Sequence, residues 1–173
     1  LARKPLALSF EQASTLPVTW STTNVAVERE RMQGGMLTMI HAAAGGVGLK
    51  AVEYAQWLHA SILGSAGRPH KHRQVFATGV ERVCSSQDAS AFCSGSMQIA
   101  AAHRWHSVLN SLSVDFIAVS FASLGERGVF VEIGKRGVWS TARNDATAQA
   151  AVYGAIALDM DMADDPWWMH GVL

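Results

Sequence analysis

HAAAGGVG, residues 41–48, is the stretch that decides the fold of this chain. The residues just before it, 36–40 (MLTMI), are short, apolar and partly β-branched, which is typical of a buried strand. The residues after it, 47–58, carry apolar side chains on one face at helical spacing. Glycine is unfavourable inside regular elements, so three glycines in four residues need a structural reason. The pattern predicts a strand, a glycine turn and a helix.

Residues 43–48 (AAGGVG) fit the dinucleotide-binding pattern G-x-G-x-x-G, with alanine at its first position. In such a turn Gly45 lets the backbone approach a pyrophosphate, and Gly48 lets the helix pack closely on the strand. The free amides at the helix start would bind the phosphates, with help from the helix dipole. A triphosphate-binding loop would need Gly-Lys followed by Ser or Thr, whereas Gly48 precedes residues 49–51 (LKA). A tight turn without a ligand is the alternative. The residues predicted to bind the pyrophosphate are Ala43, Ala44, Gly45, Gly46, Val47 and Gly48.

Composition narrows the class of protein. With 173 residues the chain is long enough for one domain with a sizeable core. Its formal net charge is zero, so nothing electrostatic indicates a nucleic acid or an anionic membrane as partner. No apolar run has the length of a membrane span, and the N-terminal stretch lacks the apolar region of a signal peptide. Cys84 and Cys93 have no metal-ligand spacing, so we expect no metal site, and ordinary thiols in a reduced, cytoplasmic setting.

Strands and helices are expected to alternate along the rest of the chain. Ser9 and Gln12 form a plausible capping box, which predicts a short helix that Pro17 ends. Further strands are expected at 61–65, 82–84, 107–110, 129–133 and 155–158, and further helices before Gly79 and at 97–104, 116–124 and 144–153. This alternation predicts an α/β fold, a Rossmann-like doubly wound parallel sheet with helices on both faces.

The loop after the second predicted strand distinguishes between cofactors. NAD-selecting proteins usually have an acidic residue about 20 positions after the glycines, but no acidic residue lies between Glu53 and Glu81. Residues 64–74 (GSAGRPHKHRQ) instead bring cations, which match the 2′-phosphate of NADPH. A solvated basic loop is the alternative. The residues predicted to serve this end of NADPH are Ser65, Gly67, Arg68 and Lys71, with Arg73 as a further cation.

Four ordered stretches carry a family resemblance: 1–18 (LARKPLALSFEQASTLPV), 39–56 (MIHAAAGGVGLKAVEYAQ), 107–112 (SVLNSL) and 128–136 (GVFVEIGKR). Together they resemble the enoyl reductase domain of modular polyketide synthases. That domain is similar to the one of animal fatty acid synthase and belongs to the zinc-free medium-chain dehydrogenase/reductase superfamily, which includes quinone oxidoreductases. The resemblance implies NADPH-dependent reduction of a 2-enoyl thioester held on an acyl carrier protein, with neighbouring polyketide synthase domains as further partners.

The resemblance also implies roles for single residues. Lys71 matches the lysine that faces the 2′-phosphate. Lys135 matches a lysine proposed as proton donor or oxyanion partner, and Asp159 matches the aspartate proposed to accompany it, although Asp161 lies close enough to be confused with it. A cation near the thioester oxygen would stabilise an enolate, and an acid must then protonate the α-carbon. Asn110 and Ser111 are expected on the nicotinamide side of the cofactor, and Leu112 and Gly134 are also expected to bind the cofactor.

Two stretches depart from the family pattern. Residues 103–107 (HRWHS) stand where a glycine-rich turn and an aspartate are usual, and Gln87 replaces a common arginine. In this superfamily a β-rich substrate domain precedes the cofactor domain and its last part returns after it. The resemblance therefore implies that residues 1–173 are the NADPH-binding domain, with 1–35 as the linker and helix leading into it and the substrate domain absent from the chain. We expect cofactor binding but weak turnover by this chain alone. A free-standing zinc-free NADPH quinone oxidoreductase and a non-catalytic structural remnant of a megasynthase remain alternatives.

Overall fold

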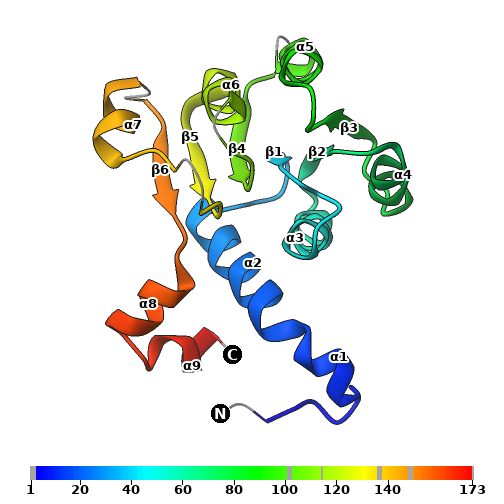
Figure 1. Ribbon diagram of the computed structural model, residues 1–173, viewed down its shortest axis with the longest axis vertical. Helices are drawn as coiled ribbons and strands as arrows, with labels where there is room; N and C mark the ends of the chain where they lie inside the picture. Colours follow the sequence, from blue (N-terminus) through cyan, green and yellow to red (C-terminus); the bar gives the residue numbers. More distant parts are fainter. Residues whose placement is uncertain (1–2, 101–102, 114, 136–137, 148–149, 173) are drawn as a thin grey trace.

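A six-stranded parallel sheet forms the centre of the computed structural model (Figure 1), which describes residues 3–100, 103–113, 115–135, 138–147 and 150–172. The strands are β1 (Leu37–Ile40), β2 (Ser61–Ala66), β3 (Arg82–Ser85), β4 (Trp105–Asn110), β5 (Leu124–Glu132) and β6 (Val152–Ala155). Their order is β3-β2-β1-β4-β5-β6, and all neighbours pair in parallel. The order reverses between β1 and β4, which is where such sheets bind ligands at the carboxyl ends of their strands.

Helices lie on both faces of this sheet. The helices of the described residues are α1 (Phe10–Ser14), α2 (Leu16–Glu30), α3 (Gly46–Trp57), α4 (Pro69–Ala77), α5 (Ala89–Ala100), α6 (Asp115–Ser123), α7 (Thr141–Thr147), α8 (Leu158–Asp164) and α9 (Trp168–Val172). Figure 1 shows α2 and α3 below the sheet and α5 and α6 above it. The prediction of a Rossmann-like, doubly wound sheet is confirmed. In the part of the chain that the structure describes, no helix is both long and apolar enough to cross a membrane.

The core has two halves because successive strand residues point to opposite faces. Ile40 of β1 and Val131 of β5 pack with residues of α2 and α3 on one face. Their neighbours Met39 and Phe130 pack on the other face with residues of α5 and α6. Burial on both faces explains why the central strands are nearly continuous apolar runs in the sequence.

The N-terminal helices differ in part from the expectation. The capping box at the start of α1 is confirmed, since Ser9 Oγ accepts from the Gln12 amide at 3.2 Å and Gln12 Oε1 accepts from the Ser9 amide at 2.9 Å. Pro17, however, does not end a helix. It lies in the first turn of α2, where a missing N–H is harmless because first-turn amides have no partner within the helix.

The segment around Tyr153 was also predicted wrongly. The expected helix 144–153 is replaced by α7, which begins at Thr141, and by β6; residues 148–149 lie outside the described residues. Tyr153 is in β6 opposite Phe130, and the two rings stack at a centroid distance of 5.8 Å. Tertiary packing of this aromatic side chain on the sheet overrides the local helical pattern.

Three other boundaries also shift. The expected strand 155–158 begins earlier, at Val152, and Leu158 starts α8 instead. The expected helix 97–104 begins earlier, at Ala89, and residues 101–102 of it lie outside the described residues. The predicted basic loop is largely helical, because α4 begins at Pro69 and carries the cations of its first turns.

Candidate functional site

The turn between β1 and α3 leaves no room for a side chain at Gly48 and little room at Gly45. A Cβ on Gly48 would lie 2.4 Å from the carbonyl oxygen of Ala42, and one on Gly45 would lie 3.1 Å from the same atom. Ala42 has a φ of 48°, a left-handed conformation that is rare for alanine. The start of α3 therefore packs directly against the backbone at the end of β1, as a dinucleotide-binding turn requires.

The first turn of α3 is uncapped. Gly45 is the N-cap residue, and no side chain bonds to the amides of the first turn. Such amides have no partner within the helix and carry the positive end of the helix dipole. This bare helix start, framed by glycines, is suited to a phosphate group.

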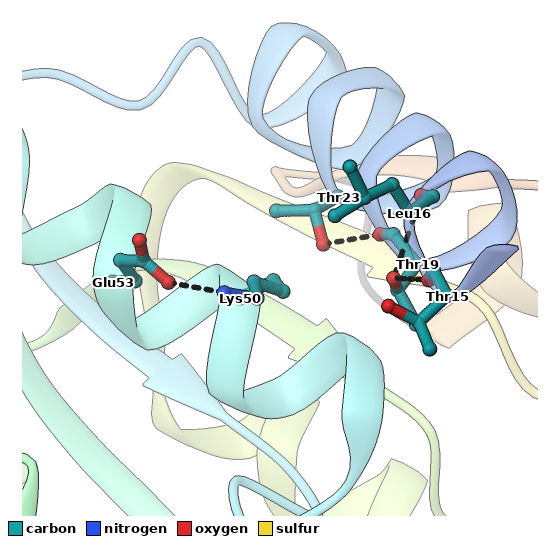
Figure 2. A network of polar contacts seen from close by, with 6 residues as sticks. All are labelled: Thr15, Leu16, Thr19, Thr23, Lys50 and Glu53. Atoms are coloured by element: carbon teal, nitrogen blue, oxygen red, sulfur yellow. Dashed lines mark hydrogen bonds and ion pairs between the residues drawn. The ribbon is translucent and has the colours of Figure 1, made fainter. Parts of the chain in front are cut away.

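Helix α2 forms a wall beside this helix start. A Cβ on Gly46 would lie 3.1 Å from Cγ2 of Thr19. Figure 2 shows the hydroxyls of Thr19 and Thr23 turned back to backbone carbonyls four residues earlier, at 2.7 Å from the oxygens of the N-cap residue Thr15 and of Thr19. Across from them, Lys50 of α3 pairs with Glu53 at 2.6 Å. The threonine hydroxyls are thus used within α2, and the close approach to Gly46 is made by a methyl group.

The end of β2 carries the residues predicted for the 2′-phosphate. Arg68 is the N-cap residue of α4, and Lys71 lies in the first turn; both side chains are exposed. A Cβ on Gly67 would lie 3.3 Å from Cγ of Gln87, so glycine leaves space between the end of β2 and the Gln87 side chain. Ser65 differs from the others, because its side chain is buried and its hydroxyl already bonds to His41 and to the Ala42 amide.

The ends of β4 and β5 are joined by a buried polar cluster around Asn110 and Glu132. Nδ2 of Asn110 donates to Oε2 of Glu132 at 2.6 Å and to the Leu112 carbonyl at 2.8 Å. The other carboxylate oxygen of Glu132 accepts from the Gly134 amide at 2.6 Å. A Cβ on Gly134 would lie 2.6 Å from that oxygen, so a side chain there would displace the Glu132 carboxylate. Burial raises the pKa of Glu132 to about 6, although the hydrogen bonds from Asn110 and Gly134 oppose the shift.

Lys135 and Asp159 form an ion pair at the same edge of the sheet. Nζ of Lys135 lies 2.9 Å from Oδ2 of Asp159, and the side chains are 72% and 64% exposed. The hydrogen bond from Lys135 lowers the pKa of Asp159. Asp161 instead pairs with Arg29 of α2 at 3.1 Å. The geometry therefore assigns Asp159, not Asp161, as the partner of Lys135.

Lys135 borders two hollows. One, of about 340 Å³, is lined by Ser111, Leu112, Ser113, Gly134 and Lys135. The other, of about 430 Å³, is mostly apolar and runs between α2 and α8. A further groove, of about 540 Å³, lies at the opposite edge, where β1, β2 and β3 begin, and contains none of the predicted site residues.

The comparisons with known proteins agree on one family, although no protein-family model matches the chain. The chain is 34% identical over 170 residues to a reducing polyketide synthase of Floropilus chiversii, which is 95% of this chain and 7% of that protein. The crystal structure of CurK enoyl reductase matches with a TM-score of 0.91 and 32% identity, over 99% of this chain and 51% of that one. The nucleotide-binding subdomain of the enoylreductase domain of PpsC from Mycobacterium tuberculosis matches with a TM-score of 0.82 and 28% identity, over 91% and 89%.

The chain belongs to the polyketide synthase enoyl reductase domains. These belong to the zinc-free medium-chain dehydrogenase/reductase superfamily. The chain spans less than a tenth of the length of the curated synthases that it matches, and about half of the CurK enoyl reductase.

The main departure from the enoyl reductase pattern, residues 103–107, lies far from the predicted site. His103 and His106 line the groove at the amino ends of the strands, and Nδ1 of His106 accepts from the Leu37 amide at 2.9 Å. Trp105 is fully buried. Gln87 differs, because it touches the corner at Gly67 beside the predicted 2′-phosphate site.

Sequence reasoning missed two buried polar residues at the carboxyl edge of the sheet, His41 and Glu132. Each is polar and adjoins apolar strand residues that end at the carboxyl edge of the sheet. A polar side chain that ends a fully buried strand is a signal that could have identified both, because burial without a partner is costly.

Proposed function

We propose that this chain is the NADPH-binding part of an enoyl reductase. In this proposal the enzyme reduces the 2,3 double bond of an enoyl thioester carried by an acyl carrier protein within a polyketide synthase. Residues 1–35 lead into the cofactor domain, and a substrate domain elsewhere in the parent protein completes the active site. The observation that carries the proposal is the Lys135–Asp159 pair, which lies at the same edge of the sheet as the glycine turn.

The residues present fit NADPH along its whole length. The cradle at Gly45 and Gly48, which a Cβ would fill, and the uncapped start of α3 suit the pyrophosphate. Arg68 and Lys71 supply exposed cations for the 2′-phosphate. The hollow beside Lys135, lined by residues 111–113 and Gly134, would take the nicotinamide end. When bound there, NADPH supplies a hydride.

Lys135 would act on the charge that the reduction creates. A hydride added to the β-carbon forms a C–H bond and moves the double-bond electrons toward the thioester oxygen, which gives an enolate. The Lys135 ammonium would stabilise that oxygen, and a proton must then reach the α-carbon, for which Lys135 is the proposed donor. Asp159, at 2.9 Å, would orient the lysine.

The second hollow beside Lys135 suits the acyl chain of the substrate. Its apolar lining includes Val18, Ile133, Leu158, Met162 and Met169. Because Lys135 borders both hollows, a thioester held at the lysine would face the nicotinamide on one side and leave its chain on apolar surface on the other. An aliphatic chain is favoured in such a groove by the hydrophobic effect.

Turnover by the full-length parent protein tests this function. NADPH oxidation is followed with an enoyl thioester of pantetheine and, separately, with a quinone, and the saturated thioester is identified by mass spectrometry. We expect oxidation with the thioester and none above background with the quinone. Oxidation with the quinone alone would support the quinone oxidoreductase alternative. No oxidation with either, in a protein that does not bind NADPH, would support the structural remnant.

A further inference from the structure

His41 is a buried side chain that the proposed mechanism does not use. It follows β1 directly and precedes the glycine turn, and only 2% of it is exposed. Nδ1 of its ring lies 3.0 Å from Oγ of Ser65 on β2, and Nε2 lies 2.8 Å from Oγ of Ser120 on α6. The ring also packs on Phe92 of α5, at a centroid distance of 5.2 Å. One imidazole therefore connects the end of β1 with β2, α5 and α6.

The hydrogen bonds around His41 have a single consistent direction. Ser120 donates its one hydroxyl hydrogen to the Phe116 carbonyl at 2.7 Å, so it must accept from His41, which places a hydrogen on Nε2. Burial lowers the pKa of His41 to about 3, so the ring is neutral and Nδ1 accepts from Ser65. The Ser65 oxygen in turn accepts from the Ala42 amide at 3.2 Å.

This chain of hydrogen bonds ends on the strained residue of the glycine turn. Ala42 has a φ of 48°, a conformation that persists in alanine only where the surroundings hold it. Its amide is held by Ser65, and its carbonyl accepts from the Gly45 amide at 2.8 Å. The carbonyl of His41 also accepts from Oγ of Ser111 at 3.3 Å, on the predicted nicotinamide side.

We propose that His41 is a positioning residue for the dinucleotide. Through Ser65 its ring holds Ala42, so that the amides at the start of α3 face the pyrophosphate, and through its carbonyl it holds Ser111. His41 does not itself touch the cofactor. The inference rests on the proposed binding of NADPH, and it concerns how the site is shaped, not which cofactor is selected.

Two buried serines on α6 provide a matched test. Ser120→Ala removes the hydroxyl that holds His41, whereas Ser123→Ala removes one that, among the described residues, bonds only to the Ser120 carbonyl of its own helix, at 2.8 Å. The dissociation constants of NADPH and NADH are measured by calorimetry on the chain itself. An equivalent subdomain of PpsC has been solved separately, and this chain has its own core on both faces of the sheet.

We expect Ser120→Ala to raise the dissociation constants of NADPH and NADH by the same factor, about three- to tenfold. One buried hydrogen bond is lost, and the pyrophosphate is common to both cofactors. Ser123→Ala should leave both constants within about twofold, the effect of a contact outside the site. Ser65→Ala should act like Ser120→Ala, and the double variant should be little worse, since both belong to one network.

Unchanged affinities in Ser120→Ala, with a melting temperature lowered as in Ser123→Ala, would show that the network is only structural and would overturn the inference. A loss of affinity for NADPH but not for NADH, in Ser120→Ala or Ser65→Ala, would overturn it too, because Ser65 would then act on the 2′-phosphate. If the unmutated chain binds neither cofactor, the proposed function fails and the inference fails with it.

A second measurement applies if Ser120→Ala does not fold. The His41 Nε2–H signal and the nitrogen shifts of the ring are then followed by NMR on the unmutated chain during titration with NADPH. Signals that NADPH does not shift would contradict the inference.

Discussion

Asn110 donates a 2.6 Å hydrogen bond from Nδ2 to Oε2 of Glu132, and this bond joins the carboxyl ends of β4 and β5. The same amide group holds the Leu112 carbonyl, and the same carboxylate holds the Gly134 amide. The two loops predicted to lie beside the nicotinamide are therefore fixed relative to each other through one pair of side chains. Removing Asn110 would leave Oε2 of Glu132 without its side-chain donor, and removing Glu132 would take the carboxylate acceptor from the Gly134 amide.

Asn110→Ala should lower the free energy of unfolding by about 1 to 3 kcal/mol, because it leaves the buried Glu132 oxygen without its side-chain donor. Urea denaturation measures the change. Asn144→Ala is the matched control, since Asn144 is also buried but its Oδ1 already has no hydrogen-bond partner among the described residues. A loss for Asn110→Ala no larger than for Asn144→Ala would contradict the role of the Asn110–Glu132 pair.

The glycines of the turn should separate folding from binding. Gly48→Ala places a Cβ 2.4 Å from the Ala42 oxygen and should cost about 3 kcal/mol or more, the upper range for overpacking. Gly154→Ala, where nothing lies within 4 Å of the new Cβ, should change stability by less than about 0.5 kcal/mol. Thermal denaturation compares the two variants. Equal melting temperatures would mean that α3 does not need its close approach to β1.

Gly45→Val should abolish NADPH binding in a folded chain. Gly45 has an ordinary extended backbone, with φ of −82° and ψ of 169°, and a Cβ there would lie 3.1 Å from the Ala42 oxygen, so we expect valine to need a small shift of the turn but not to unfold the chain. Its side chain would stand where the pyrophosphate must approach the start of α3. Calorimetry gives the affinity and circular dichroism checks the fold. Unchanged NADPH affinity would mean that the glycine pattern is only a structural turn.

The chain should bind NADPH more tightly than NADH. Neutralising Arg68 and Lys71, both exposed at the start of α4, should narrow that difference by about 1 to 3 kcal/mol, as is typical of charge-assisted contacts. Arg82→Ala removes an exposed cation at the opposite edge of the sheet and should leave the difference unchanged. Equal affinities for the two cofactors in the unmutated chain, measured by calorimetry, would refute the choice of NADPH.

Glu30 should make the chain less stable as the pH rises. Only 1% of this residue is exposed, and neither carboxyl oxygen has a hydrogen-bond partner of normal geometry among the described residues. Burial raises the pKa of Glu30 to about 8, although nearby Ser107 opposes the shift. Because the folded pKa lies above the ordinary value of 4.5, folding favours the protonated form. Burial of Glu30 therefore does not lower the free energy of unfolding below about pH 4.5, and it lowers it by the full amount near pH 8 and above.

Glu30→Gln keeps the shape without the charge, so it should raise the free energy of unfolding by about 2 to 4 kcal/mol at pH 8 relative to pH 5. Urea denaturation at both pH values measures this difference against the unmutated chain. Glu53→Gln, on a side chain that is 59% exposed, is the control and should not change the difference between the free energies of unfolding at pH 5 and pH 8. A parallel pH profile for Glu30→Gln and the unmutated chain would show that Glu30 is not protonated in the fold.

The sheet and the glycine turn could be predicted because each is encoded locally. The apolar run before Ala42 and the helical spacing after Gly48 are each contained in a short stretch of sequence, and the structure forms β1 and α3 there. The error at Pro17 had a different cause: proline is compatible with the first turn of a helix as well as with the end of one. Sequence spacing alone does not distinguish the two positions.

The polar network of the site could not be predicted, because its partners are distant in the sequence. His41 reaches Ser120 across 79 positions, and Asn110 reaches Glu132 across 22. The choice between Asp159 and Asp161 likewise depends on Arg29, which α2 brings to Asp161 across 132 positions. Those contacts exist only once the sheet has assembled, so no local pattern records them.

The proposed roles of Lys135 and Asp159 can be tested in the intact parent protein. If Lys135 stabilises the enolate or donates the proton, it acts mainly in the transition state, so Lys135→Ala should lower kcat with little change in NADPH affinity. Loss of one such group typically costs about 100-fold or more. Asp159→Asn should show a milder loss, because Asp159 only orients the lysine through the 2.9 Å contact.

The neighbouring ion pair supplies the control, since Asp161→Asn breaks only the contact with Arg29 and should leave turnover unchanged. The double variant of Lys135 and Asp159 should be little worse than Lys135→Ala alone, because groups that work as a unit are not additive. Stopped-flow measurement of NADPH oxidation separates turnover from cofactor binding. Near-normal turnover for Lys135→Ala would remove the lysine from the mechanism, and the proton would then have to come from the substrate domain or from water. A loss for Asp161→Asn equal to that for Asp159→Asn would instead mean that the local fold of α8, not the lysine–aspartate pair, governs the rate.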